Sequence, residues 1–376
     1  MTTTALEDRV SINSHFDPSS VRSRSTAEVE AFHLTMPGFT SSPLIPLPSL
    51  AQQLGAKAVF VKYEAARLGL PSFKIVGASW AVNCAIAERL GSSVPADFAG
   101  LLELASHLPS GTTLTTATDG NHGRAVAHVA RLAGLPSRIF VPADMATPRR
   151  VDIAGEGAEI VVVDGSYDDA VRQSAASARD RPHELIVSDT SWPGYERIPA
   201  QVVAGYATIH REALAQVRAH GHTGFDIAFV PAGVGSFASS AVQALAPVRS
   251  EVVTVEPQDT DCIRRSLVVG APTVVPGPHR SIMAGLNCGE VSAIAWPQLR
   301  CGVRAAAAVT DDETRAAIRT LARLGIPSGE SGAAALAGAT LVAAATPGLV
   351  QDRVVLLYDS EGVTDPDAYA ALIGPS

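Results

Sequence analysis

Residues 226–245 read DIAFVPAGVGSFASSAVQAL, a short apolar run followed by a glycine turn and an alanine-rich stretch. An apolar run without alternating polar residues is typical of a strand in a parallel sheet that is covered on both faces. A glycine turn that leads into a helical pattern completes one strand–turn–helix unit. The segment therefore predicts part of an α/β sheet.

The same alternation of apolar strands and helices extends over most of the chain. Strands are predicted at Ala58–Tyr63, Thr112–Ala117, Arg138–Val141, Glu159–Val163, Leu185–Val187, Asp226–Val230, Val252–Val255 and Arg353–Tyr358. Helices are predicted at Val76–Leu90, Gly123–Ala133, Ala170–Ala178, Ala200–Ala219, Phe237–Leu245 and Thr314–Leu324. This order predicts an α/β fold with mostly parallel sheets flanked by helices. About the first 35 residues look weakly structured.

Length, charge and hydropathy exclude several classes of protein. The 376 residues are enough for two lobes. The net charge of -8 argues against a nucleic-acid partner, because neutralising phosphates requires clustered Lys and Arg. The apolar runs fall short of the roughly 20 residues that span a bilayer, and residues 1–16 lack the apolar core of a signal peptide. We therefore expect a cytoplasmic protein without a membrane partner. The four cysteines show no CxxC pairing, so we expect no metal site and no disulfide framework.

Four loops that follow predicted strands carry candidate chemistry, because ligands of open α/β sheets bind beyond the carboxyl ends of the strands. The first loop holds Lys74 between apolar residues, within the run FKIVGA of residues 73–78. A low-dielectric site lowers the pKa of a lysine and favours Schiff-base chemistry. The alternative is a surface lysine at a helix start.

The second loop reads TDGNHG at residues 118–123. Its two glycines permit close approach to a ligand, and the helix that follows offers backbone N–H groups to an anion. Asp119 and Asn121 are equally compatible with ordinary helix caps.

The third loop, from Gly233 to Ser236, has a composition that cradles phosphate with backbone amides. It also matches the start of a dinucleotide fingerprint, and Glu256 ends the next strand where an acid would bind ribose. A nicotinamide enzyme would leave Lys74 and Asp119 without a role.

In the fourth loop, Ser360 follows the last strand, and its hydroxyl is suited to a heteroaromatic nitrogen or to a routine turn.

Together, and in this order, the loops resemble those of the fold-type II pyridoxal-phosphate enzymes, the tryptophan-synthase-β superfamily. Within that superfamily the chain looks like the diaminopropionate ammonia-lyases, over residues 37–369 or so. The segments that carry the resemblance are SFK at 72–74 with Lys62, ATDGNHG at 117–123, DTSWPGYERIP at 189–199, AGVGS at 232–236, VEP at 255–257, DC at 261–262, IMAGLNCGE at 282–290 and SGESG at 328–332. The run KYEAAR at 62–67 and Val363 depart from the family pattern.

The resemblance implies an architecture. Two lobes, each with a mostly parallel sheet flanked by helices, would hold pyridoxal 5'-phosphate in the cleft between them. The large domain would comprise residues 1–80 plus 196–376, and the small domain residues 81–195. A homodimer is expected from the resemblance and because two-fold assemblies are common.

The resemblance also implies roles for single residues. Lys74 would form an imine with the cofactor, and Asn121 would hydrogen-bond its ring hydroxyl. The phosphate would be held by Gly233, Val234, Gly235 and Ser236, and Ser360 would face the pyridine nitrogen. Asp119 and Asp189 would be carboxylates placed for proton transfer, and Lys74 and Asp119 would approach Cα from opposite faces.

The implied activity is α,β-elimination of ammonia from 2,3-diaminopropionate to give pyruvate and ammonia. Two carboxylates favour a cationic β-ammonium group, which a plain serine dehydratase does not need to bind. Other readings remain open at this point: a serine or threonine dehydratase, a β-replacement synthase of the same fold, a protein that binds the cofactor without turnover and, more distantly, an NAD-dependent oxidoreductase.

Overall fold

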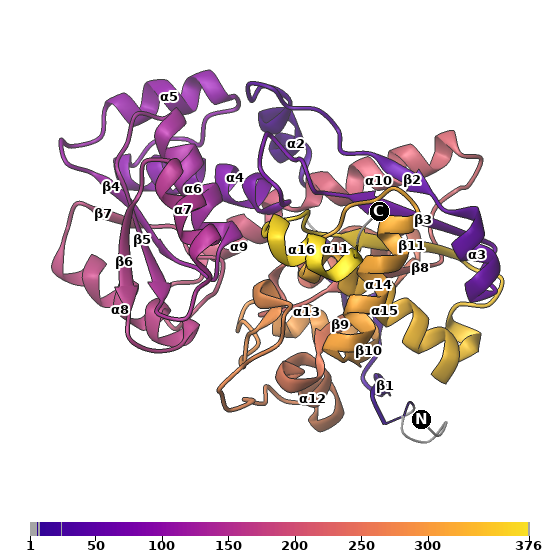
Figure 1. Cartoon of the computed structure of the whole chain (residues 1–376). Coiled ribbons are helices and arrows are strands. Elements are labelled where there is room, and N and C mark those ends of the chain that lie inside the picture. The colour runs from indigo at the N-terminus through magenta and orange to yellow at the C-terminus, as the bar shows by residue number, and fades with distance from the viewer. Residues whose placement is uncertain (1–5, 7, 24, 375–376) are drawn as a thin grey trace. The chain divides into compact units, whose positions relative to one another are not determined.

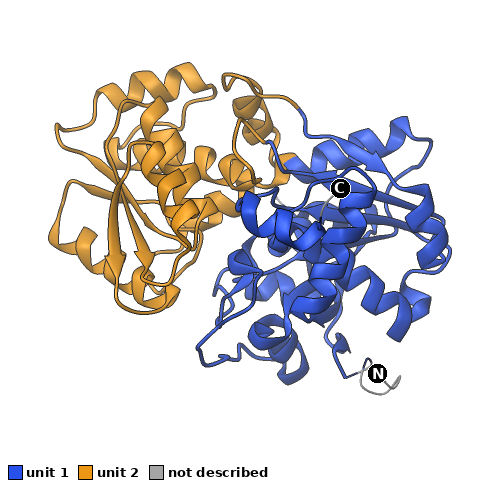
Figure 2. Ribbon diagram, in the orientation of Figure 1, with its two compact units in different colours: residues 1–24, 41–66, 209–376 blue, residues 25–40, 67–208 orange. Residues whose placement is uncertain are grey.

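The computed structural model describes residues 6, 8–23 and 25–374, which form two compact units (Figures 1 and 2). Unit 1 comprises residues 1–24, 41–66 and 209–376, and unit 2 comprises residues 25–40 and 67–208. The resemblance implied a large domain of residues 1–80 plus 196–376 and a small domain of residues 81–195. These bounds differ from those of the two units, and the domain division stays a prediction.

Within its described residues, unit 1 holds a seven-stranded sheet in the order β1-β10-β9-β8-β11-β3-β2. The five central strands run parallel, and the edge strands β1 and β2 are antiparallel to their neighbours. The strands are β1 (Val10–Ile12), β2 (Leu44–Pro46), β3 (Ala58–Tyr63), β8 (Ile227–Pro231), β9 (Glu251–Pro257), β10 (Val303–Val309) and β11 (Val354–Asp359). The α-helices of this unit are α3 (Pro48–Leu54), α11 (Ser236–Leu245), α12 (Cys262–Val269), α13 (Trp296–Gly302), α14 (Asp311–Arg323), α15 (Glu330–Ala345) and α16 (Pro366–Ile373).

The described part of unit 2 holds a four-stranded parallel sheet in the order β6-β5-β4-β7, flanked by helices (Figure 1). The strands are β4 (Thr113–Ala117), β5 (Ser137–Pro142), β6 (Glu159–Val163) and β7 (Glu184–Ile186). The helices are α2 (Ala27–Leu34), α4 (Lys74–Leu90), α5 (Phe98–Ser106), α6 (Asn121–Leu132), α7 (Thr147–Gly155), α8 (Tyr167–Asp180) and α9 (Arg197–Gly205). Helix α10 (Ala207–Ala219) starts at the end of unit 2 and continues into unit 1.

The predicted α/β fold is confirmed, and each predicted strand is present with its ends within two residues. Two predictions about local structure were wrong, and one strand was not predicted. The helix predicted at Ala200–Ala219 is two helices, α9 and α10, with Tyr206 between them. Residues 303–309 form the central strand β10 although four alanines stand in a row. The expected weakly structured start contains β1 and α2. Among the described residues, no helix is both long enough and apolar enough to cross a membrane.

The core of unit 1 depends on close contact between α15 and the sheet. Helix α15 is rich in alanine and glycine and packs against β8, β9, β10 and β11. A Cβ atom added at Gly338 would lie 2.3 Å from Cγ2 of the buried Val255 on β9. Small residues on this helix therefore set the distance between helix and sheet, because protein interiors have little spare volume.

We expect Gly338→Val to destabilise the protein by about 2 kcal/mol or more, since the larger side chain must displace Val255 or the helix. Gly348→Val is the matched control, because a Cβ at Gly348 meets nothing within 4 Å. The free energy of unfolding, measured by urea denaturation, should change by less than about 0.5 kcal/mol in the control. Equal stability of the two variants would contradict this account of the core.

Candidate active site

Lys74 is the first residue of α4, and it meets a carboxylate from a distant part of unit 2. Its Nζ atom donates a hydrogen bond to Oδ2 of Asp189 at 2.7 Å, across 115 residues of sequence. Only 20% of the Lys74 side chain and 7% of the Asp189 side chain are exposed. Asp189 follows β7, so the carboxyl end of that strand brings its side chain to the start of α4. Two predicted site residues are thus brought together.

The electrostatics of Lys74 differ from the sequence-based expectation. Burial lowers the pKa of the Lys74 amine, but Asp189, Tyr206 and Asp119 raise it by more, so that its pKa lies above the ordinary value. The expectation of a lowered pKa was wrong because it considered only the apolar neighbours in sequence. Burial raises the pKa of Asp189, while His122 and Lys74 lower it by more. The pair is therefore ionised.

The turn that carries Asp119 lies between β4 and α6, as predicted. The Thr118 hydroxyl accepts hydrogen bonds from the amides of Gly120 at 2.9 Å and Gly123 at 3.0 Å. Gly120 has φ +150°, and a Cβ at Gly123 would lie 2.4 Å from Cγ2 of Thr118. Thr118 thus closes the turn, and Asp119 lies near enough to raise the pKa of Lys74. Asn121 is the first residue of α6.

Three further residues surround the Lys74–Asp189 pair, and the sequence did not identify them as site residues. The Tyr167 hydroxyl donates to Oδ1 of Asp189 at 3.3 Å. His122 donates from Nε2 to the Val187 carbonyl at 2.8 Å, and its Nδ1 lies 3.9 Å from Asp189. Burial lowers the pKa of His122, which favours the neutral ring. Tyr206 lies beside Lys74 and influences its pKa. These contacts are between distant segments, so no local pattern predicts them, although His122 itself belongs to the TDGNHG turn.

The glycine turn in unit 1 lies between a strand and a helix, as predicted. It connects β8 to α11, and Gly235 has φ +92°. A Cβ atom added at Gly233 would lie 2.9 Å from Sγ of Cys288. A Cβ atom added at Gly235 would lie 2.6 Å from Cδ1 of Leu299. Helix α11 starts at Ser236, and among the described residues no side chain caps it at Gly235. A glycine turn that leads into a helix start is the kind of backbone that binds a phosphate.

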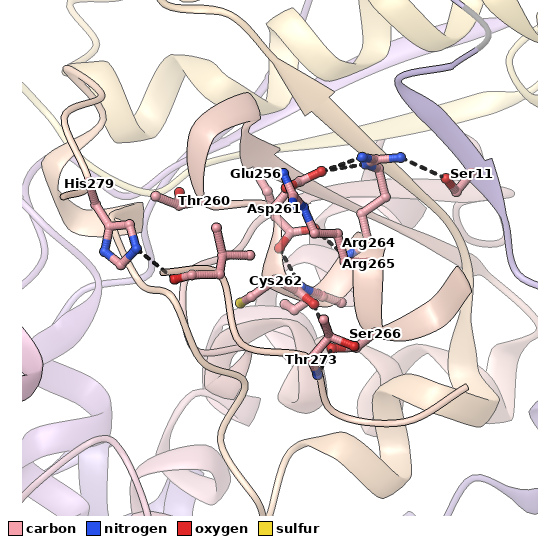
Figure 3. Close-up of polar contacts among 12 residues, drawn as sticks. Ser11, Glu256, Thr260, Asp261, Cys262, Arg264, Arg265, Ser266, Thr273 and His279 are labelled. Atoms are coloured by element: carbon pink, nitrogen blue, oxygen red, sulfur yellow. Dashed lines mark hydrogen bonds and ion pairs between the residues drawn. The ribbon is translucent and has the colours of Figure 1, made fainter. Parts of the chain in front are cut away.

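Glu256 is the acid that would bind ribose if the glycine turn belonged to a dinucleotide site. It has a different role in the structure (Figure 3). It is fully buried and accepts hydrogen bonds from the amides of Ile263 at 2.7 Å and Arg264 at 2.8 Å, in the first turn of α12. Burial raises the pKa of Glu256 to about 8, and the two amides oppose this rise. Because each carboxylate oxygen holds the backbone of α12, Glu256 is not available to a ribose, and the dinucleotide reading is wrong.

Ser360 follows β11 and is buried, and its hydroxyl donates to the Ser331 carbonyl at 3.4 Å. The neighbouring Asp359 is also buried and accepts from the Ser328 hydroxyl at 3.0 Å. Burial raises the pKa of Asp359 well above its usual range, which favours the neutral acid. Among the described residues, no group of three or more His, Cys, Asp or Glu side chains is arranged to hold a metal ion.

Comparison with known proteins agrees with these observations. A family model described as "Pyridoxal-phosphate dependent enzyme" matches residues 35–359. Diaminopropionate ammonia-lyase of Escherichia coli K12 is 34% identical over 360 residues, which cover 91% of this chain and 89% of the relative. The enzyme of the same name from Salmonella typhimurium is 35% identical over 372 residues, or 92% and 91% of the two chains.

Among solved structures, the Escherichia coli enzyme in complex with an aminoacrylate–PLP azomethine reaction intermediate matches with a TM-score of 0.86 and 32% identity. The match covers 97% of this chain and 96% of that one. The resemblance seen in the four loops is thereby confirmed. The chain belongs to the pyridoxal-phosphate-dependent enzyme family and, within that family, to the diaminopropionate ammonia-lyases.

Proposed function

We propose that this protein releases ammonia from 2,3-diaminopropionate and that water then converts the product to pyruvate and a second ammonia. The observation that carries the proposal is the ion pair of Lys74 with Asp189, together with the charge of Asp119, which raises the pKa of the same amine. An amine that attacks an aldehyde and two carboxylates that bind a cationic substrate are the groups that this reaction requires.

The residues that would hold pyridoxal 5'-phosphate are those that the resemblance implies. Lys74 would bind the aldehyde carbon, and Asn121 would bind the ring hydroxyl. The phosphate would be bound by the residues from Gly233 to Ser236, a proposal that the glycine turn before α11 supports. Ser360 would face the pyridine nitrogen. When bound, the cofactor supplies an extended π system that stabilises negative charge at Cα of the substrate.

The two carboxylates would act on the substrate itself. Asp189 is held ionised in a buried site, where a carboxylate attracts a β-ammonium group far more strongly than it does in water. A protonated amine is also a better leaving group than a neutral one. Lys74 and Asp119 would remove the Cα proton from opposite faces, so that both enantiomers react.

We propose in addition that the protein is a cytoplasmic homodimer. The short apolar runs support the location, and the frequency of two-fold assemblies supports the dimer.

The scarcity of lysine allows a direct test of the attachment site. The chain has three lysines: Lys57, Lys62 and Lys74. Lys62 is fully buried and ion-paired with Glu212 at 2.7 Å. Borohydride reduction of the cofactor-loaded protein, followed by peptide mass mapping, should place the cofactor on Lys74.

Lys74→Ala should lose the yellow band at about 410–430 nm and all pyruvate release, since no other amine can take its place. Lys57→Ala is the control and should keep both. Label on Lys57, or full turnover by Lys74→Ala, would contradict the proposal.

Asp189→Asn tests the role of the carboxylate. We expect kcat/KM for diaminopropionate to fall about a hundredfold or more, because the amide neither attracts an ammonium nor accepts a proton. D-Serine and L-serine carry a neutral hydroxyl at the same position, so their pyruvate release should fall less. Pyruvate can be followed in both cases by coupling to lactate dehydrogenase. If kcat/KM fell equally for diaminopropionate and for the two serines, Asp189 would not recognise the β-ammonium group.

A further inference from the structure

His122 is a buried residue of unit 2 to which the proposed function gives no role. It is the second residue of α6, and only 1% of it is exposed. Its Nε2 atom lies 2.8 Å from the Val187 carbonyl oxygen. A carbonyl only accepts hydrogen bonds, so the proton of the neutral ring sits on Nε2 and the lone pair on Nδ1. Among the described residues, no group forms a hydrogen bond with this Nδ1.

Lys74 and His122 direct nitrogen atoms at the same oxygen atom of Asp189. Nζ of Lys74 lies 2.7 Å from Oδ2 of Asp189, and Nδ1 of His122 lies 3.9 Å from the same Oδ2. The other oxygen, Oδ1, accepts the hydrogen bond of the Tyr167 hydroxyl. A charged N–H···O bond is about 2.7–2.9 Å long, so a shift of roughly 1 Å would let a protonated Nδ1 bond Oδ2. The lysine ammonium and a histidine cation are thus alternative partners of one carboxylate oxygen.

The backbone after β7 holds His122 and Asp189 beside each other. Val187, whose carbonyl binds the ring, precedes Asp189 by two residues. The Tyr195 hydroxyl bonds the backbone on both sides of Val187, at 2.9 Å and 3.1 Å. One anchored segment therefore supplies both the acceptor for Nε2 and the carboxylate that faces Nδ1.

Lys74 and Asp189 act on the proton affinity of His122 in opposite directions. Burial lowers the pKa of His122, Asp189 raises it and Lys74 lowers it, with a net fall. The start of α6 also opposes a cation, because the N-terminal end of a helix carries partial positive charge. Asp119, in the turn before α6, adds a second negative charge near Lys74. Once Lys74 loses its charge, one cause of the fall is gone and the attraction of Asp189 remains.

We propose that His122 is a positioning residue that accepts the proton of the Lys74 ammonium and then replaces it as the cationic partner of Asp189. The inference rests on the proposed function, in which Lys74 takes up the cofactor. An ammonium has no lone pair, so Lys74 must lose a proton before its nitrogen can attack an aldehyde. The proton leaves Nζ, the N–H electron pair stays on that nitrogen, and the Nδ1 lone pair binds the proton beside Oδ2. Asp189 thereby keeps a cation until a substrate ammonium takes the same place.

The first test follows the charge of His122 in the full-length, cofactor-free protein by NMR of ¹⁵N-labelled histidine. His122→Gln removes the signals of one of the ten histidines and so assigns them, and a glutamine amide can still donate to the Val187 carbonyl. In Lys74→Met the titration midpoint of His122 should rise by about one pH unit or more, because a nearby positive charge is lost. In Asp189→Asn the midpoint should fall, since the attracting negative charge is lost.

Lys57→Met is the matched control, because it removes the charge of an exposed lysine of unit 1, and it should leave the midpoint of His122 unchanged. The ¹⁵N shifts should also place the proton of the neutral ring on Nε2. A His122 midpoint that is no higher in Lys74→Met than in the wild type would overturn the proposal. So would a midpoint that does not fall in Asp189→Asn, which decides the matter if Lys74→Met does not fold.

The second test follows cofactor loading without turnover. Pyridoxal phosphate is mixed with the cofactor-free enzyme, and the band at about 410–430 nm is recorded over time. Near pH 7 loading should be about tenfold or more slower in His122→Gln than in the wild type, because the acceptor of the Lys74 proton is missing. The difference should shrink as the pH rises and hydroxide takes that proton instead. His128→Gln changes another histidine of α6 and should load at the wild-type rate.

Equal loading rates of His122→Gln and the wild type at every pH would overturn the proposal. If the loaded wild type releases no pyruvate from diaminopropionate, the proposed function fails, while the titration of the cofactor-free protein still decides the role of His122.

Discussion

The ammonium of Lys74 and the carboxylate of Asp189 lie 2.7 Å apart at the start of α4, and most of each side chain is buried. Removing either partner would leave a buried, uncompensated charge, which costs about 3–5 kcal/mol. If Lys74 carried the cofactor, as proposed, its ammonium would no longer balance the charge of Asp189. A β-ammonium group is a cation of the same kind. The pair seen here is thus a model of the contact that Asp189 would make with the substrate.

Close backbone approach is what allows these groups to meet. Glycine at positions 77 and 205 lets α4 and α9 touch, and glycine at position 123 lets α6 start against Thr118. In unit 1 the same device shapes the turn before α11, where Gly235 adopts a left-handed conformation. In these places a Cβ would lie within 3 Å of another atom, so the sites are fixed by backbone packing as much as by the reactive side chains.

Local sequence patterns predicted the fold and the loops of the candidate site. Strand–turn–helix order located Lys74, the Asp119 turn and the glycine turn, because each belongs to one continuous segment. The patterns did not predict β10, since alanine is a good helix former and only the neighbouring strands make it a strand. The ionisation of Lys74 was also missed, because its partner Asp189 is 115 residues away. The roles of the individual site residues stay predictions.

Glu256 illustrates why a motif needs its surroundings before it can be assigned a function. A glycine turn followed by an acid at the end of the next strand is the pattern of a dinucleotide site, and the spacing here fits it. What the pattern does not contain is the segment that packs on the strand end. Here α12 begins there, and two of its first amides bind the carboxylate. A helix start offers N–H groups and a partial positive charge, so it competes with a ribose for the same acid. The amides of α12 bind Glu256 because they belong to the same chain and already lie beside its carboxyl group.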